Sequence, residues 1–257
     1  AKASLGLNKG RLVNLDKVSE VVGQPANIAL GQRIADDAVT LVRDNGKILP
    51  LKRIGTAAGG LPYQTVEVVH NRLVVVILVD DVRTDAGRTL ELQIRERVPD
   101  VNVLYVDSEI ADGMSAGILK AVDEAQTVIA AVYAAPVAGR AVPGANGQLT
   151  NSVSLADASA ALLQKLLDRG AAKTMVLAMG NPYLAQSFPA VQNYLCTFSD
   201  VSVAEVRAVK ALFGEIAIHG HLPVTIPGIA GRGTGIERPA RVAEGGSQHA
   251  HTQSSGQ

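Results

Sequence analysis

The chain has 257 residues, of which 47% are hydrophobic and 19% charged, a composition typical of a globular protein rather than a disordered or fibrous one. Lys+Arg and Asp+Glu both number 24, so the formal net charge is zero and we expect no basic surface for nucleic acid. Only 3% of the residues are aromatic and Trp is absent, which argues against a module that stacks its rings on sugars or on single-stranded nucleic acid. No run reaches the roughly 18 apolar residues of a membrane helix, so we expect no membrane span.

The first 50 residues predict a linker and then a helix. Residues 1–26 have few periodic apolar positions, and we expect an inter-domain linker there. The apolar residues that follow have helical spacing: Ile34, Ala38, Leu41 and Val42. Asn45-Gly46 are favourable residues for the end of such a helix. On this helix the adjacent Asp36 and Asp37 are expected at a solvated edge and not as a catalytic carboxylate pair.

Short apolar, β-branched runs recur through the middle of the chain. They are residues 73–79, 101–106, 127–133, 174–179 and, more weakly, 194–198. Unbroken apolar runs of this length suit strands that are buried on both faces of a parallel sheet. The last of these runs holds the single cysteine, Cys196, which we expect to be a buried, unreactive thiol.

Amphipathic segments alternate with these runs. Their apolar stripes are Leu90, Ile94 and Val98, then Leu155, Ala158, Leu162, Leu163 and Leu166, and finally Val206, Val209 and Phe213. Ser202 and Glu205 precede the last stripe with capping-box spacing. The alternation predicts an α/β fold, a three-layer α/β/α sandwich around a mostly parallel sheet of about six strands.

The end of the chain changes character. Leu222–Pro227 is strongly apolar and contains two prolines, which suits an edge strand. Residues 244–257 are poor in apolar residues, and we expect a disordered tail. The α/β domain is therefore expected to span residues 27–243.

One motif would make the chain a self-contained enzyme. Gly113-Met114-Ser115-Ala116-Gly117 matches the G-x-S-x-G pattern of serine hydrolases, with His219 or His221 as a base by elimination. The pattern needs its serine on a sharp turn directly after a strand, whereas five residues separate the expected strand from Gly113. A serine hydrolase using Ser115, or a nucleotide binder of the doubly wound kind, stays open as the alternative function class.

The remaining polar motifs do not predict a ligand site. Gly231–Gly235 is rich in glycine, but no helix pattern or lysine follows as a phosphate-binding loop requires. Asp80-Asp81 lacks the further strand-end aspartate of a phospho-acceptor domain. The four histidines at 219, 221, 249 and 251 have no cysteine or carboxylate ligand at metal-binding spacing. We expect no metal and no cofactor.

Three passages resemble glycoside hydrolases of family 3. Lys2–Leu7 is similar to the join after the catalytic barrel, and Ile34–Arg43 with Ile48–Leu51 is similar to the segment that opens the second domain. Gly180–Tyr183 and Leu212–Glu215 follow in the family's order, and Gly220–Pro227 is the most specific match. The resemblance spans roughly residues 1–230, and it implies a carboxy-terminal α/β domain that packs on an amino-terminal catalytic barrel.

The resemblance also implies a division of chemistry. The nucleophilic aspartate of the family lies in the barrel, and in β-glucosidase-like members a loop of this second domain supplies the acid/base glutamate. The matching segment here, residues 136–153, contains no Glu and no Asp. The chain therefore more closely resembles the β-N-acetylhexosaminidase branch, in which both groups lie in the barrel, and alone it is expected to be inactive.

Substrate contact by this domain would then be indirect. Loops at the carboxyl ends of the strands can wall the substrate cleft, and the candidate residues are Arg140, Asn146, Asn181 and Tyr183. The expected partner is the catalytic barrel. The resemblance is compatible with an exported or periplasmic bacterial enzyme.

Overall fold

The structure is a computed structural model that describes residues 1–10, 12, 14–52, 73–134, 141–143, 149–151 and 155–241. Six strands form its main sheet, in the order β1-β8-β7-β4-β2-β3. Their bounds are β1 Thr40–Asp44, β2 Leu73–Leu78, β3 Asn102–Val106, β4 Thr127–Tyr133, β7 Thr174–Met179 and β8 Asn193–Cys196. Every neighbouring pair is parallel except β1 and β8, which run antiparallel. This confirms the prediction of about six mostly parallel strands.

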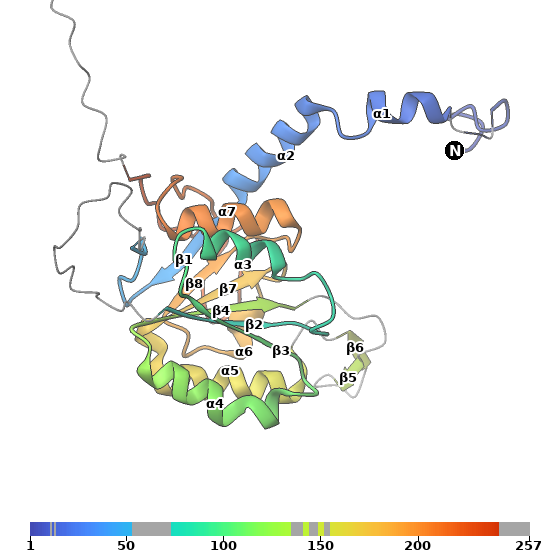
Figure 1. The fold of residues 1–257 in the computed structure, drawn as a ribbon. Coiled ribbons are helices and arrows are strands. Elements are labelled where there is room, and N and C mark those ends of the chain that lie inside the picture. Colours follow the sequence, from blue (N-terminus) through green and yellow to red (C-terminus); the bar gives the residue numbers. More distant parts are fainter. Residues whose placement is uncertain are drawn as a thin grey trace, which may run out of the picture.

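Helices cover both faces of the sheet and complete the three-layer sandwich (Figure 1). On one face lie α4 (Ala111–Glu124) and α5 (Asp157–Gly170), and on the other lie α3 (Arg88–Arg95) and α7 (Ser202–Leu212). The apolar runs alternate side chains between two cores, so that Val76 and Leu78 pack against α4 and α5 while Val75 and Ile77 pack on the opposite face. Burial on both faces explains why these strands are apolar at every position. A short 3-10 helix (Ala171–Lys173) precedes β7, and α6 (Leu184–Ser187) follows it.

The prediction that the helix continues through Leu41 and Val42 is wrong. The helix in this region, α2 (Pro25–Ala38), ends before Val39, and the chain continues as the edge strand β1. Leu41 packs in the core under α3 and α7, whereas Val42 packs in the core under α4 and α5. Neighbouring residues that point to opposite faces have the period of a strand. Backbone pairing of Thr40 and Leu41 with β8 decides the conformation over the helical spacing.

The edge strand expected at Leu222–Pro227 is also absent, because β1 occupies that edge of the sheet. The segment is a loop whose apolar residues are buried, with Leu222 1% and Ile226 0% exposed. Leu222 exchanges backbone hydrogen bonds of 2.8 Å with residues 233 and 234, and Ile226 forms an isolated bridge to Ala230. The apolar pattern of this segment therefore predicted its burial correctly, but the prediction of a strand was wrong.

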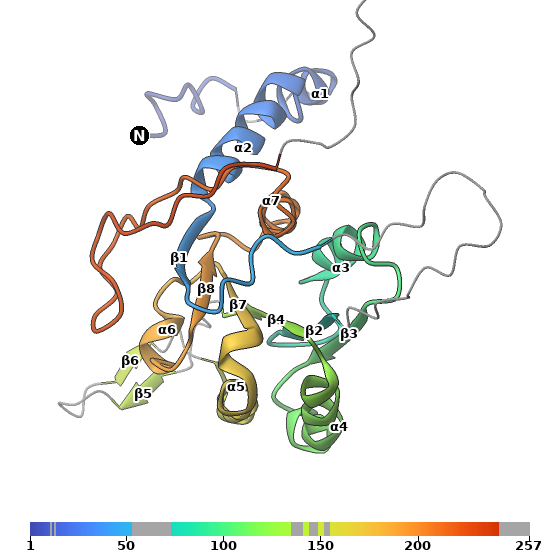
Figure 2. The ribbon, with the colours of Figure 1, turned by 90° about the vertical axis from the view of Figure 1, so that its left-hand side faces the viewer.

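An amino-terminal arm, residues 1–38, stands off the sandwich (Figures 1 and 2). It holds a 3-10 helix (Leu15–Lys17), α1 (Val18–Val21) and α2, and none of the described side chains of these helices is buried. The predicted tail, residues 244–257, lies outside the described residues. None of the helices that the structure describes combines the length and the hydropathy needed to cross a bilayer.

Candidate functional site

The carboxyl ends of the parallel strands meet at one edge of the sheet, where α/β proteins place their ligands. The loops that follow β2, β3, β4, β7 and β8 leave from this edge. Two of the predicted cleft residues, Asn181 and Tyr183, lie in the loop after β7. Arg140 and Asn146 belong to the segment after β4 and lie outside the described residues.

The loop after β7 is held by a small set of hydrogen bonds. Gly180 takes a φ of 98°, a left-handed conformation that favours glycine. The Asn181 side-chain oxygen accepts a hydrogen bond of 3.0 Å from the Tyr183 backbone N–H. From below, the buried Tyr194 hydroxyl donates to the Pro182 carbonyl at 2.9 Å. Tyr183 itself is 38% exposed, so a fixed loop presents an accessible ring at this edge.

This loop lies beside the exit of β4. Met179, the last residue of β7, is paired with Tyr133, the last residue of β4. A Cβ atom on Gly180 would lie 4.0 Å from the Ala134 carbonyl oxygen. Within the segment that follows Ala134, β5 (Ala141–Pro143) and β6 (Leu149–Asn151) form a two-stranded antiparallel sheet. The structure thus brings the Asn181–Tyr183 loop to the root of the segment that carries the other two candidates.

Two aspartates at this edge are already engaged. The guanidinium of Arg83 binds both oxygens of Asp81 and holds the pKa of that carboxyl low, at about 2. Asp107, which follows β3, is 6% exposed and accepts hydrogen bonds from the backbone N–H groups of Val82, Glu109 and Ile110 at 3.0 to 3.2 Å. A general acid must hold its proton near neutral pH, and Asp81 does not.

Glu205 is the residue at this edge that the sequence analysis misassigned. Its predicted role was to cap α7, but its side chain points to α3 and is 2% exposed. It accepts hydrogen bonds of 2.9 Å from the Gly87 and Leu90 backbone N–H groups and one of 2.7 Å from the Tyr133 hydroxyl. The available signal was its spacing from Val209 and Leu212, which places a carboxylate on the buried face of α7.

The serine-hydrolase alternative is wrong. Ser115 lies inside α4, which begins at Ala111, and not on a strand-to-helix turn. His219 lies beyond α7 on the other face of the sheet, where its Nε2 is 2.9 Å from Asp37 Oδ1. An elbow needs the serine at the tip of the turn with the base in hydrogen-bond reach. Ser115 does not meet the first requirement, and His219 does not meet the second.

The other polar motifs lie at structural positions. In the segment Gly231–Gly235, no helix follows, and the Leu222 N–H donates to the Thr234 carbonyl at 2.8 Å. Among the residues that the structure describes, no three His, Cys, Asp or Glu side chains gather as a metal site would require. Cys196 is 0% exposed, and burial raises the pKa of its thiol to about 12. The prediction that this cysteine is buried is confirmed.

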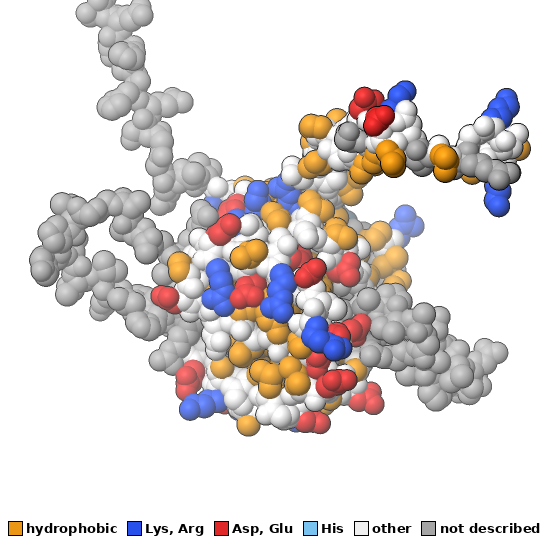
Figure 3. Space-filling view, turned by 45° about the vertical axis from the view of Figure 1, so that its right-hand side comes forward, with side chains coloured by type: hydrophobic (Ala, Val, Ile, Leu, Met, Phe, Trp, Pro, Cys, Tyr) orange, Lys and Arg blue, Asp and Glu red, His pale blue; other side chains and the backbone are white. Residues whose placement is uncertain are grey.

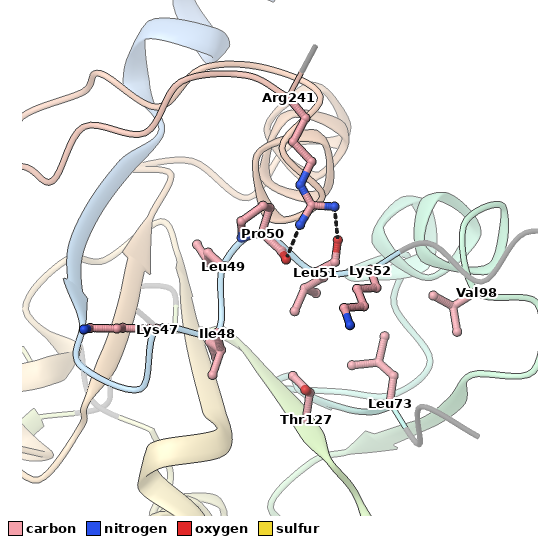
Figure 4. A pocket seen from close by; sticks show the side chains of 10 residues that line it. All are labelled: Lys47, Ile48, Leu49, Pro50, Leu51, Lys52, Leu73, Val98, Thr127 and Arg241. Carbon is pink, nitrogen blue, oxygen red and sulfur yellow. Dashed lines mark hydrogen bonds between the residues drawn. The ribbon is translucent and has the colours of Figure 1, made fainter. Parts of the chain in front are cut away.

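A hollow of about 370 Å³ lies at the opposite end of the sheet (Figure 4). Its wall includes Leu73 and Thr127, the first residues of β2 and β4. Arg241 crosses its rim and donates to the Pro50 carbonyl at 2.9 Å and to the Leu51 carbonyl at 3.5 Å. Because it opens at the amino ends of the strands, this hollow is separate from the edge that carries Asn181 and Tyr183.

Comparison with protein families assigns the fold. The family described as "Glycosyl hydrolase family 3 C-terminal domain" matches residues 39–252. The chain belongs to this family. The match begins at Val39, immediately before β1, so that the whole arm lies outside it. Comparison with curated proteins gives no match.

Solved structures with the family 3 domain are similar in fold. A fungal multi-domain family 3 β-N-acetylglucosaminidase superposes with a TM-score of 0.59 at 20% identity, over 86% of this chain and 21% of that one. A family 3 β-N-acetylglucosaminidase from Paenibacillus sp. superposes with a TM-score of 0.55 at 17% identity, over 88% of this chain and 36% of that one. A β-glucosidase from Listeria innocua superposes with a TM-score of 0.61 at 15% identity, over 88% of this chain and 30% of that one. The chain therefore spans between a fifth and about a third of the length of these proteins.

Proposed function

We propose that this domain is the accessory carboxy-terminal domain of a family 3 glycoside hydrolase of the β-N-acetylhexosaminidase type. In this proposal a catalytic barrel carries the nucleophile and the proton donor. The α/β domain, residues 27–243, packs on that barrel, with residues 1–26 as linker, and walls the substrate cleft. Alone, it hydrolyses nothing.

The observation that carries the proposal is the composition of the segment after β4. Hydrolysis of a glycosidic bond with retention or inversion needs a proton donor beside the leaving oxygen. Residues 136–153 contain no Asp or Glu and therefore offer no carboxyl group for this task. The barrel must then supply the proton donor as well as the nucleophile.

The state of the neighbouring carboxylates supports the same division. Asp81 is held ionised by Arg83, and the Glu205 carboxylate is sealed between α3, α7 and β4. Asp81 therefore has no proton to donate, and Glu205 is not accessible to a sugar. What the edge does offer is the accessible Tyr183 ring and the Asn181 amide, which suit binding better than proton transfer.

The experiment compares three substrates. The purified chain, the barrel domain of the same parent protein and their mixture are each incubated with nitrophenyl N-acetyl-β-glucosaminide, nitrophenyl β-glucoside and nitrophenyl acetate. We expect the mixture to hydrolyse the N-acetylglucosaminide at least tenfold faster than the glucoside, and the chain alone to hydrolyse none of the three. A mixture that prefers the glucoside refutes the hexosaminidase assignment, and hydrolysis by the chain alone refutes the accessory role.

A further inference from the structure

The end of α2 is fixed to the sandwich. Asp36 forms an ion pair with Arg207 of α7 at 3.1 Å, and the Arg207 side chain is only 11% exposed. Asp37 pairs with His219 at 2.9 Å. The small residues Ala35 and Ala38 are partly covered on the side of the helix that meets the body. These contacts set the direction in which the helix leaves the domain.

The large apolar side chains of the same helix are uncovered. Ile28 is 53% exposed, Leu30 47% and Ile34 61%. Leu30 and Ile34 are one turn apart and lie on the same side of the helix. An amphipathic helix ordinarily turns its aliphatic residues to a core, but α2 has no buried residue.

Such exposure is concentrated in the arm, where hydrophobic side chains gather along the helices (Figure 3). The described residues of the arm that are large, hydrophobic and exposed are Leu5, Leu7, Leu12, Leu15, Val18, Val22, Ile28, Leu30 and Ile34. In the described part of the sandwich the corresponding residues are Leu92, Tyr183 and Val201. Large apolar side chains that remain exposed together on one segment mark an interaction site.

We propose that the α2 face formed by Leu30 and Ile34 is the surface on which the catalytic barrel docks. This inference rests on the proposed function. The family is that of a carboxy-terminal domain, and the arm is on the amino-terminal side, where such a domain joins the rest of its protein. In two solved relatives the matching part is 21% and 36% of the chain, so a large remainder is available as occupant.

In this proposal α2 is a rigid connection between the two domains and not a flexible linker. The Asp36–Arg207 ion pair and the Asp37–His219 hydrogen bond hold its carboxyl end against the sandwich, and the barrel would cover its aliphatic side. Both contacts together fix the angle between the domains and thereby the position of the Asn181–Tyr183 loop over the cleft.

The test measures binding of the 257-residue chain to the barrel domain by isothermal titration calorimetry. The double variant Leu30→Gln/Ile34→Gln replaces the aliphatic face, and Ile28→Gln replaces an exposed aliphatic residue on the other side of the same helix. Leu92→Gln, at a helix position of α3 that is 63% exposed, is the matched control. We expect the double variant to raise Kd at least tenfold, and both Ile28→Gln and Leu92→Gln to leave it unchanged. Equal urea unfolding curves establish that all variants fold.

Three results would overturn the inference. If the double variant binds the barrel as tightly as the wild type, the docking surface is elsewhere, and the proposed function stands. If the wild-type chain neither binds the barrel nor changes its turnover, the proposed function fails together with the inference. If the wild-type chain alone sediments as a dimer that the double variant abolishes, a second copy covers this face.

Discussion

The hydroxyl of Tyr133, the last residue of β4, donates a hydrogen bond of 2.7 Å to the carboxylate of Glu205 on α7. The same carboxylate accepts from the N–H groups of Gly87 and Leu90 at the start of α3. The buried side chain of Glu205 thus joins three elements: it belongs to α7 and accepts hydrogen bonds from β4 and from the start of α3. The amino end of a helix favours a negative charge in this place.

We expect Glu205→Gln to lower the free energy of unfolding by about 2–3 kcal/mol, because the neutral amide turns an N–H group toward N–H donors and loses charge-assisted bonds. Tyr133→Phe leaves the two backbone bonds of Glu205 in place and should cost about 1 kcal/mol. Urea unfolding of both variants measures the difference. Equal losses of unfolding free energy for the two variants would show that the hydrogen bonds of Glu205 to the N–H groups of α3 contribute nothing to stability.

A second buried contact joins Arg97 to Glu215, the last residue of the Leu212–Glu215 motif. The guanidinium binds both carboxylate oxygens, at 2.6 and 2.7 Å, and its side chain is 5% exposed. We expect Arg97→Ala to cost about 2–4 kcal/mol, because it removes a buried guanidinium together with its two charge-assisted hydrogen bonds to Glu215. Arg95→Ala, which removes the more exposed pair with Glu91 on the same helix, should cost less than about 1 kcal/mol. Thermal unfolding of the two variants decides.

Replacing glycine by alanine should have opposite effects on stability at different positions of the chain. In Gly220→Ala the new Cβ would lie 2.6 Å from Thr40 Oγ1 and closer still to the Val39 carbonyl, so backbone must move. Gly113 and Gly117 lie in α4 with nothing within 4 Å of a Cβ. There we expect alanine to raise stability by about 0.5–1 kcal/mol each, and at Gly220 to lower it by at least about 2 kcal/mol. A loss of stability in the α4 variants would contradict the packing described for that helix.

Burial of Cys196 makes stability depend on alkaline pH. The folded thiol has a raised pKa of about 12, whereas an unfolded cysteine ionises near about 8.5. The unfolded state therefore loses its proton first, so this contribution is fully present below about pH 8.5 and is lost as the pH rises toward the folded value. We expect the stability of Cys196→Ala to fall less steeply between pH 8.5 and 11 than that of the wild type, in urea titrations. Identical slopes would mean that the thiol is accessible, and rapid native-state labelling with a thiol reagent at pH 8 would agree.

The exposed ring at the carboxyl edge predicts an effect on substrate binding. In the complex with the barrel, we expect Tyr183→Ala to raise KM for nitrophenyl N-acetyl-β-glucosaminide by about three- to tenfold with kcat changed by less than twofold, because a wall contact made equally in the ground and transition states affects binding alone. Gln186→Ala, at an exposed position of the adjoining α6, is the control. A fall in kcat with unchanged KM would assign Tyr183 a part in the chemical step.

The central layers of the fold were predictable because burial leaves a local pattern. Leu73–Leu78 and Thr174–Met179 are apolar at every position since both faces of their strands are covered, and that pattern is visible without any neighbour. The stripe through Leu90 and Ile94 likewise identifies the inner side of α3. Such features depend on short stretches of chain.

What was missed depends on partners far away in the sequence. Thr40–Asp44 is a strand because β8, about 150 residues later, pairs with it, and the same residues have helical spacing when considered alone. Leu222 and Ile226 are buried in a loop because β1 already occupies the edge of the sheet. Glu205 has a normal capping position in α7, and only the approach of α3 shows its true partners. At the candidate site, the order of motifs predicted the Asn181–Tyr183 loop at the carboxyl edge, where the structure has it.

The central claim is that the chemistry resides in the barrel and that this domain shapes binding. The most direct measurement is the steady-state rate of hydrolysis of nitrophenyl N-acetyl-β-glucosaminide by the barrel domain, with and without the chain. We predict that saturating chain lowers KM at least threefold, that the kcat pH profile keeps the same limbs, and that the chain alone shows no turnover. Turnover by the chain alone, or a limb of the kcat profile that appears only when the chain is present, would contradict the account by assigning a catalytic proton donor to this domain.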